Sequence, residues 1–286
     1  MRVALLQMRS GTDPVRNVAS LRDGVAEAAS RGARYVQTPE MTGLVQRDRS
    51  ALLDAATRWN RDPCVLAASE LAGRHGVWLH IGSTAVLTDR GDRVANRAFL
   101  FGPDGTMRAS YDKLHLFDVD LEGGESWRES ALYVVGKEAV LCDLDVGGET
   151  ARLGLSICYD LRFPELYRQM ARAGATLLAV PAAFTARTGR DHWSVLLRAR
   201  AIECGSFVLA AAQGGVHEDG RQTWGRSAVV DPWGRVVDEL AHDEPGVLLA
   251  DIDPAEALTA RARIPNLRHG RTFGLRVVGT RAEAAT

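Results

Sequence analysis

The chain has 286 residues, of which 46% are hydrophobic and 25% charged, a composition that excludes a disordered chain and fits one or two globular domains. Its 35 basic and 36 acidic residues sum to a net charge of −1 without a basic run, so neither nucleic acid nor an anionic membrane is an expected partner. No secretory or membrane-spanning pattern occurs, and four cysteines in a chain of this length do not predict a disulfide scaffold. We therefore expect a reduced protein of the cytoplasm.

Short apolar runs alternate with amphipathic stretches along most of the chain, which predicts an α/β architecture with helices covering a mixed sheet. Strands are predicted over 3–6, 35–36, 77–83, 97–101, 106–111, 153–157, 176–180, 207–212, 227–230, 236–240 and 247–252. Helices are predicted from Pro14 to Gly32 and from Pro63 to Gly76, each after an aspartate suited to an N-cap, and over 164–173 and 193–204.

No internal repeat, low-complexity tract or linker interrupts this pattern. The sequence therefore predicts a single domain over 1–275. After Pro254 the chain becomes rich in arginine and only weakly periodic. Residues 276–286 are predicted to form a polar tail that is either disordered or an arm for binding a partner.

Cys158 stands where an apolar strand pattern ends and a helix signal at Pro164 begins. A side chain at such a sharp turn is lifted out of the sheet, and backbone N–H groups beside it can hold an oxyanion. Cys158 is therefore a candidate nucleophile. The alternative is a buried cysteine that acts as a small hydrophobic residue, which is how we interpret Cys64, Cys142 and Cys204.

Glu40 follows Thr38 and Pro39 at the end of the predicted strand over 35–36. The carboxyl ends of strands form the edge at which α/β sheets place ligands. If the site encloses Glu40 with little water, the pKa of its carboxyl group should rise and the group could act as a general base. The alternative is a solvated glutamate in a loop.

Lys113 follows the first predicted hairpin, and with Lys137 it is one of only two lysines among 35 basic residues. An ammonium is a compact charge that can stabilise a developing oxyanion, whereas a guanidinium is bulkier. The alternative is a surface lysine whose stem lies along apolar groups. His115, Asp118 and Asp120 nearby are residue types that ligate metals, so a metallohydrolase is another interpretation of this segment.

Together these segments resemble the nitrilase superfamily of carbon–nitrogen hydrolases. The resemblance rests on 38–40 (TPE), 111–116 (YDKLHL) and 156–165 (SICYDLRFPE), and it extends from Arg2 to about Gly274. Glu129, within 127–130 (WRES), matches the second glutamate of the family.

The resemblance implies a four-layer α-β-β-α sandwich that assembles as a homodimer or higher homo-oligomer, and a reaction without cofactor or metal. It implies that Cys158 is the nucleophile, Glu40 the general base and Lys113 the cation that stabilises the oxyanion, while Glu129 positions the substrate or the lysine. The backbone N–H of Tyr159 would complete the oxyanion hole. A neighbouring lysine and glutamate can share protons with the thiol, so the thiolate would form at the moment of attack.

Within the superfamily the sequence resembles the amidase branch that includes deaminated glutathione amidase and omega-amidase. The matching segments are 183–185 (AFT), 188–189, 193–203, 210–213 and 229–234. The resemblance implies hydrolysis of a terminal carboxamide on a small carboxylated substrate, through a cysteine thioester and with release of ammonia. Deaminated glutathione is the expected substrate and alpha-ketoglutaramate the alternative. A catalytically idle, oligomeric binding protein is an alternative from a different class.

Substrate contacts are expected from segments near the nucleophile. The candidates are Tyr159, Phe184, Thr185 and Arg187. An anionic acyl chain needs a cationic group, and an arginine can hold a carboxylate through two parallel hydrogen bonds. Arg187 is expected to supply this group, whereas Arg162 is expected to pair with Asp160 or Glu165 and brace the turn.

Overall fold

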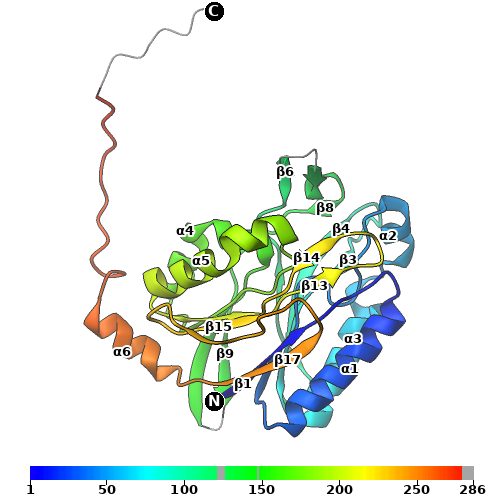
Figure 1. Cartoon of the computed structure of the whole chain (residues 1–286), viewed down its shortest axis with the longest axis horizontal. Coiled ribbons are helices and arrows are strands. Elements are labelled where there is room, and N and C mark those ends of the chain that lie inside the picture. Colours follow the sequence, from blue (N-terminus) through cyan, green and yellow to red (C-terminus); the bar gives the residue numbers. More distant parts are fainter. Residues whose placement is uncertain (121–125, 147, 279–286) are drawn as a thin grey trace, which may run out of the picture.

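Two β-sheets lie face to face in the computed structural model, which describes residues 1–120, 126–146 and 148–278. Helices α1 and α3 cover the outer side of one sheet, and α4 and α5 cover the outer side of the other (Figure 1). The layer order is therefore α-β-β-α, which confirms the predicted sandwich.

The first sheet combines the N-terminal half of the chain with one late strand. Its order is β17-β1-β2-β3-β4-β5, with β8 also paired to β4; β1, β2 and β3 are parallel, and β17 is antiparallel to β1. Its strands are Arg2–Gln7 (β1), Tyr35–Gln37 (β2), Trp78–Leu87 (β3), Val94–Phe101 (β4), Met107–Asp112 (β5), Tyr133–Val134 (β8) and Gly246–Asp251 (β17).

The second sheet has the order β16-β15-β12-β11-β10-β9, with β10, β11 and β12 parallel. Its strands are Leu141–Val146 (β9), Glu149–Gly154 (β10), Leu177–Ala179 (β11), Phe207–Ala210 (β12), Ala228–Val230 (β15) and Val236–Glu239 (β16). Two separate ribbons consist of Asp118–Asp120 (β6) with Ser126–Arg128 (β7), and Gly214–Val216 (β13) with Gln222–Trp224 (β14). Residues of β7 and of the turn between β13 and β14 line the pocket described below.

The two sides of β1 serve two different cores. Val3 and Leu5 pack in the cluster between the sheets, and Ala4 and Leu6 pack in the cluster under α1 and α3. Successive side chains of a strand point to opposite faces. Because both faces are covered, the strand is a continuous apolar run rather than an alternating one, which explains the pattern in the sequence.

The helices follow their capping signals. Asp13 and Asp62 accept backbone N–H groups at the starts of α1 and α3, as predicted. The helices are Pro14–Ser30 (α1), Arg49–Ala55 (α2), Pro63–His75 (α3), Pro164–Arg172 (α4), Ala186–Cys204 (α5) and Ala255–Arg263 (α6). Within the described residues, no helix is both long enough and apolar enough to cross a membrane.

One helical prediction needs correction, and two helices were missed. Helix α5 begins at Ala186 rather than Trp193, because the Thr185 side chain caps it and its first turns are polar. Helices α2 and α6 were not predicted. In α2 only Leu52 is buried, and in α6 only Ala257 and Ala260 are buried. Neither helix therefore shows a strong periodic pattern of apolar residues.

The strand predictions are confirmed with shifted ends, apart from six short or edge strands that were missed. The strand predicted over 153–157 ends at Gly154 as β10, and Leu155 then bonds to the Val140 carbonyl as the chain approaches Cys158. The missed strands are those of the two ribbons, β6 with β7 and β13 with β14, together with the short strand β8 and the edge strand β9. Strand β9 is only partly buried, because it lies at the edge of its sheet.

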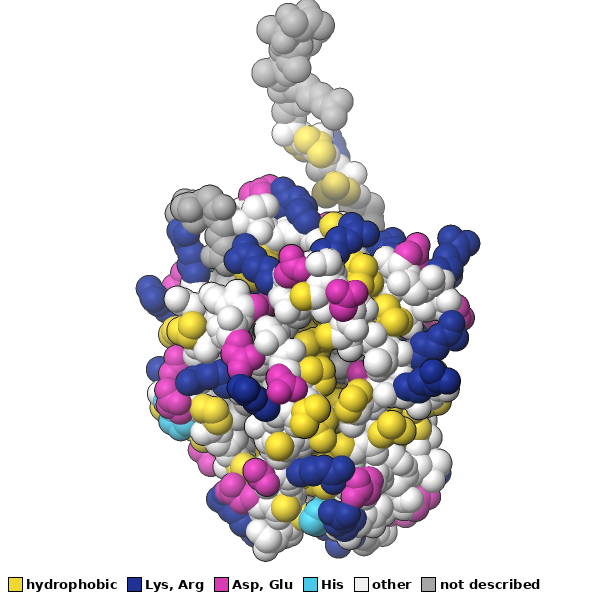
Figure 2. Space-filling view, turned by 90° about the vertical axis from the view of Figure 1, so that its right-hand side faces the viewer, with side chains coloured by type: hydrophobic (Ala, Val, Ile, Leu, Met, Phe, Trp, Pro, Cys, Tyr) yellow, Lys and Arg dark blue, Asp and Glu magenta, His cyan; other side chains and the backbone are white. Residues whose placement is uncertain are grey.

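After α6 the chain first rests against the body and then leaves it. The Asn266 side chain donates a hydrogen bond to the Glu203 carbonyl at 2.7 Å. Residues 271–278 project outward, and Phe273 and Leu275 are exposed (Figure 2). The same view shows acidic and basic side chains interspersed over the face below. The predicted tail over 276–286 lies mostly outside the described residues, so the domain limits stay a prediction.

Gly82 of β3 offers a test of how tightly the two sheets meet beside the site. A Cβ atom at this position would lie 2.2 Å from the Thr38 carbonyl oxygen and 2.4 Å from Cβ of Pro181. We expect Gly82→Ala to lower the free energy of unfolding by about 1–3 kcal/mol, because backbone must move. Urea unfolding measures this change. In the control Gly73→Ala, the new Cβ lies no closer than 3.5 Å to its neighbours, and the helix should gain up to about 1 kcal/mol. A Gly82→Ala protein as stable as the parent would contradict the packing described.

Candidate active site

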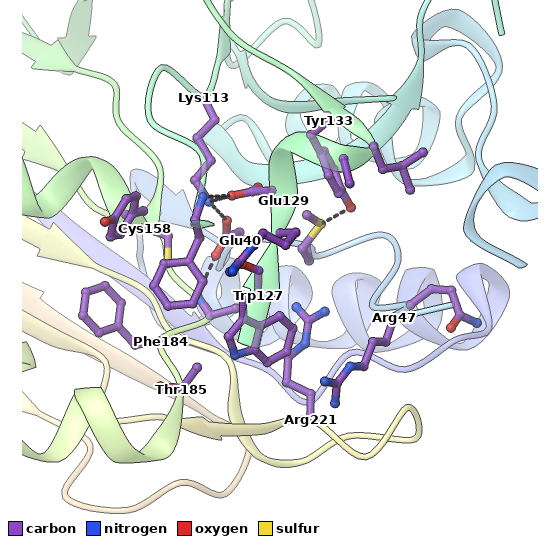
Figure 3. Close-up of a pocket in the computed structure, with 18 of the residues that line it drawn as sticks. Glu40, Arg47, Lys113, Trp127, Glu129, Tyr133, Cys158, Phe184, Thr185 and Arg221 are labelled. Carbon is purple, nitrogen blue, oxygen red and sulfur yellow. Dashed lines mark hydrogen bonds and ion pairs between the residues drawn. The ribbon is translucent and has the colours of Figure 1, made fainter. Parts of the chain in front are cut away.

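The predicted catalytic side chains converge in one pocket, although they come from four distant segments (Figure 3). Glu40 follows β2, and Cys158 lies beyond the end of β10 in the facing sheet. Lys113 comes directly after β5, and Glu129 directly after β7. The site therefore forms where the carboxyl ends of strands from both sheets meet, as the α/β architecture favours.

Lys113 is the centre of a buried ion cluster. Its Nζ donates to Glu40 Oε1 at 2.8 Å and to Glu129 Oε1 and Oε2 at 3.1 and 2.9 Å. Lys113 is 2% exposed and Glu40 4%. Charges this deeply buried persist only when paired and hydrogen-bonded, so each of the three residues depends on the others.

Further donors hold the two carboxylates in place. Asn96 Nδ2 donates to Glu40 Oε1 at 2.9 Å and to Glu129 Oε1 at 3.1 Å. The backbone N–H of Ala183 donates to Glu40 Oε2 at 3.0 Å, and that of Phe117 donates to Glu129 Oε2 at 2.6 Å. Sequence reasoning missed Asn96. The available signal was an amide inside the apolar run of β4, since a buried polar group requires partners.

The charges around Glu40 correct the expectation that its pKa is raised. Burial alone would raise the pKa of its carboxyl group, as predicted. The Lys113 charge and hydrogen bonds to the carboxylate outweigh burial, so the pKa of Glu40 is lowered. In turn, burial disfavours the ammonium of Lys113, but Glu129 and Glu40 outweigh burial and hold the pKa of Lys113 well above its usual value. Glu40 is therefore an ionised base beside a protonated lysine.

Cys158 sits at a strained turn. Its φ is +49°, a left-handed conformation that side-chain-bearing residues rarely adopt, and its N–H donates to the Pro181 carbonyl at 2.8 Å. It begins the short 3₁₀ helix η3 (Cys158–Arg162) that leads into α4. Burial raises the pKa of the thiol well above its usual value, with a further increase from Glu40 that Lys113 partly opposes. The resting nucleophile candidate is therefore a neutral thiol.

Asp160 joins the turn of Cys158 to the loop of Lys113. It is fully buried. Its carboxylate accepts the Ile157 N–H at 2.8 Å, the Tyr111 hydroxyl at 2.7 Å and the His115 N–H at 3.0 Å. Because these partners belong to segments on either side of the pocket, Asp160 sets the spacing between nucleophile and cation.

The three residues considered as metal ligands do not converge. His115 Nδ1 lies 2.7 Å from Asp160, Asp118 accepts a backbone N–H, and Asp120 pairs with Arg128 at 2.7 Å. Across the described ranges, no group of three or more His, Cys, Asp or Glu side chains is arranged to hold a metal ion. Their chemistry here is structural hydrogen bonding and ion pairing.

Three of the four predicted substrate contacts line the pocket, namely Tyr159, Phe184 and Thr185. The Thr185 hydroxyl also accepts the Thr188 N–H as the cap of α5. Tyr159 packs edge-on against Phe117 with 5.0 Å between ring centroids. Aromatic rings thus form much of the wall around Cys158.

Arg187 is not among the pocket-lining residues and lies exposed on the first turn of α5. Arg162 lines the pocket instead, with its guanidinium 5.5 Å from the Phe184 ring centroid and hydrogen-bonded to His192 at 3.1 Å. Among the described contacts, Arg162 pairs with neither Asp160 nor Glu165 as expected, and other groups occupy the Asp160 carboxylate. Of the two arginines considered in the sequence, Arg162 therefore lines the pocket and Arg187 does not.

The cavity has a volume of about 320 Å³, within the range of about 300–1,000 Å³ typical of small-molecule sites. Sequence reasoning missed its outer wall, to which Arg47, Trp127, Tyr133 and Arg221 contribute. Trp127 lies in the segment 127–130, in which the sequence singled out only Glu129, and no local pattern marks the other three, because only the fold brings these distant segments together.

Comparison with known proteins agrees with this architecture. The carbon–nitrogen hydrolase family model matches residues 2–262. A deaminated glutathione amidase of Yersinia enterocolitica is 38% identical over 271 residues, covering 94% of this chain and 92% of the relative. The NitFhit crystal structure from Caenorhabditis elegans has a TM-score of 0.85 and 36% identity, covering 94% of this chain and 65% of that chain. A Nesterenkonia amidase variant, solved with acrylamide added at its active-site cysteine, has a TM-score of 0.75 and 29% identity, covering 93% of this chain and 98% of that one.

The fold and the pocket are those of an enzyme whose site lies between two facing sheets. With the match over most of its length, the chain belongs to the carbon–nitrogen hydrolase family of the nitrilase superfamily, which confirms the resemblance seen in the sequence. It is a hydrolase of carbon–nitrogen bonds.

The compactness of the lysine ammonium can be tested directly. We expect Lys113→Arg to be nearly as damaging as Lys113→Ala, each lowering kcat by at least about 10²-fold, because the guanidinium cannot occupy the space between the two glutamates. Steady-state kinetics measures kcat, and circular dichroism verifies the fold. Lys137→Arg, the other lysine and outside the pocket, is the control. An active Lys113→Arg enzyme would show that charge alone is needed.

Proposed function

We propose that this protein is an amidase of the deaminated glutathione amidase type, which acts on a small carboxylated substrate through a thioester on Cys158. The observation that carries the proposal is a cysteine that shares one pocket with an ionised Glu40 and a protonated Lys113. Relatives that are 34% and 38% identical carry the name deaminated glutathione amidase.

In the first half-reaction, Cys158 Sγ bonds to the carbonyl carbon while its proton passes to Glu40. The oxygen of that carbonyl gains negative charge, which the Lys113 ammonium and the Tyr159 N–H stabilise. Tyr159 belongs to the first turn of η3, where N–H groups lack acceptors within the helix. The C–N bond then breaks, and the leaving nitrogen takes the proton from Glu40. Because the thiol is neutral at rest, proton transfer must accompany attack.

In the second half-reaction, water attacks the thioester. Glu40 removes a proton from the water, the C–S bond breaks, and the sulfur regains its proton as the acid product leaves. Glu129 contacts Lys113 through both carboxylate oxygens. Its role in this scheme is to aim the ammonium at the oxyanion rather than to react.

The leaving group separates the two candidate substrates. In deaminated glutathione the acyl group is attached to the nitrogen of cysteinylglycine, so hydrolysis releases that dipeptide. Ammonia, the product expected from the sequence, arises only from a primary amide such as alpha-ketoglutaramate. The two activities can therefore be measured separately, one by the release of cysteinylglycine and the other by the release of ammonia.

A variant of the nucleophile tests the proposal. We expect Cys158→Ala to lose more than about 10³-fold in kcat, because no thioester can form, while Cys142→Ala, outside the pocket, retains activity. Chromatography detects cysteinylglycine from deaminated glutathione, and a coupled assay detects ammonia from alpha-ketoglutaramate, nitriles and N-carbamoyl amino acids.

Deaminated glutathione should be the preferred substrate in this panel. Preference for alpha-ketoglutaramate would place the enzyme with the omega-amidases, and preference for a nitrile or N-carbamoyl compound would overturn the amidase assignment. Ligand binding without turnover of any compound would favour the idle binding protein, and an active Cys158→Ala enzyme would remove the nucleophile assignment.

We also propose a homodimer or higher homo-oligomer in the cytoplasm. Val195 and Ile202 on α5 are 66% and 54% exposed, and Trp233 of the adjoining turn is 40% exposed. Such an apolar face favours burial against another copy. The four cysteines are free thiols, as suits a reducing compartment.

Light scattering tests the assembly. We expect at least twice the chain mass of 31.0 kDa, and a shift toward the monomer for Val195→Asp, which puts a charge on the apolar face. An exposed position elsewhere, Val15→Asp on α1, is the control. A sharp mass of 31.0 kDa for the unmodified protein would contradict the proposal.

A further inference from the structure

Two guanidinium groups flank one indole at the outer end of the pocket. The Cζ atoms of Arg47 and Arg221 each lie 4.9 Å from the ring centroid of Trp127. These side chains lie together on the side of the pocket away from Cys158 (Figure 3). All three line the same cavity as the nucleophile, so one bound molecule can span both ends.

The three residues come from separate parts of the fold. Arg47 lies in the loop between β2 and α2, Trp127 in β7, and Arg221 in the turn between β13 and β14. Their juxtaposition brings two like charges together. Like charges within one pocket repel unless an anion lies between or beside them.

Within the described residues, the two arginines have few ion-pair partners. Among the described residues, no ion pair involves Arg47, and Arg221 reaches Asp219 only at a long 3.7 Å. The Arg221 side chain is 17% exposed, and its Nε is buried without a hydrogen-bond partner in the described part of the chain. A buried guanidinium nitrogen without an acceptor is costly, and a carboxylate in the pocket would relieve that cost.

The acidic residues of the pocket are at its other end. Among the described residues, the carboxylates that line it are those of Glu40 and Glu129, and both are paired with Lys113. Over the described residues, the outer end therefore carries the positive charges of Arg47 and Arg221, whereas the charges at the inner end are paired with one another. This difference gives an anionic ligand one preferred direction in the cavity.

Stacking leaves the recognition edges of a guanidinium available. An arginine over an aromatic ring uses its flat face, and its N–H groups point outward in the plane, where they fit a carboxylate. The indole adds an apolar wall for the chain that bears the carboxylate. The chemistry matches a carboxylate at the end of a short, partly apolar chain.

We propose that Arg47, Trp127 and Arg221 bind the carboxylate of the leaving group, and so make the enzyme specific for amides whose amine portion is anionic. This inference rests on the proposed amidase function. For deaminated glutathione the bound group is the terminal carboxylate of cysteinylglycine. Alpha-ketoglutaramate releases ammonia and has no group for this subsite, so the subsite distinguishes the two substrates.

Substrate selectivity gives the main test. We expect Arg221→Gln, and likewise Arg47→Gln, to lower the ratio of kcat/KM for deaminated glutathione over alpha-ketoglutaramate by about 10–100-fold, the usual worth of a hydrogen bond to a charged group. Arg58→Gln, an exposed arginine paired with Asp89 outside the pocket, should leave the ratio unchanged. An unchanged ratio in the pocket variants, or equal losses on both substrates, would overturn the inference while leaving the amidase function intact.

A modified substrate identifies the contacting group. When the terminal carboxylate of deaminated glutathione is converted to a carboxamide, the kcat/KM of the unmodified enzyme should fall by the same factor. Arg221→Gln should not lower kcat/KM for this modified substrate any further, since the change in the enzyme and the change in the substrate remove the same contact. Additive losses would show that Arg221 acts through structure rather than on the carboxylate.

Product binding tests the subsite without turnover. Calorimetry should detect cysteinylglycine binding to the unmodified protein and weaker binding to Arg221→Gln. If neither amide were hydrolysed, the proposed function would fail, and this titration would still decide the inference. Absence of binding, or equal binding to both proteins, would overturn it.

Discussion

The buried ion cluster around Lys113 is the interaction on which the site depends. An ammonium that is 2% exposed has lost most of its hydration, and Glu40 and Glu129 replace it at hydrogen-bond distance. Removing one partner of a buried ion pair typically costs about 3–5 kcal/mol, because the remaining charge is uncompensated. The loops after β2, β5 and β7 are therefore held at fixed spacing by the same charges that the proposed reaction uses.

The same cluster sets the protonation states of Glu40 and Cys158. Lys113 keeps Glu40 ionised despite its burial, whereas burial and the charge of Glu40 keep the Cys158 thiol protonated. In the proposed reaction, the base is thus ready before substrate arrives, and the nucleophile becomes reactive only as its proton leaves. A permanently charged thiolate would be exposed to oxidation and alkylation at all times.

The sequence by itself determined much of the fold because its signals are local. Asp13 and Asp62 with their following prolines mark helix starts, and the apolar runs that form β1 and β3 mark strands buried on both faces. Helix α6 and the edge strand β9 were not predicted from the sequence. Both are only partly buried, and a partly buried element has a weak apolar pattern.

The sequence also singled out Glu40, Lys113 and Cys158 as candidates, because each stands at the end of a strand within a distinctive motif, and the carboxyl ends of strands form the edge at which α/β sheets place ligands. Only the tertiary structure decided what surrounds them. It lowered the pKa of Glu40, which burial alone would raise, by placing Lys113 2.8 Å away. It likewise placed Asn96 and Arg221 in the site. Such contacts join residues far apart in the chain, and no local pattern records the electrostatic or hydrogen-bonding partner that folding brings to a side chain.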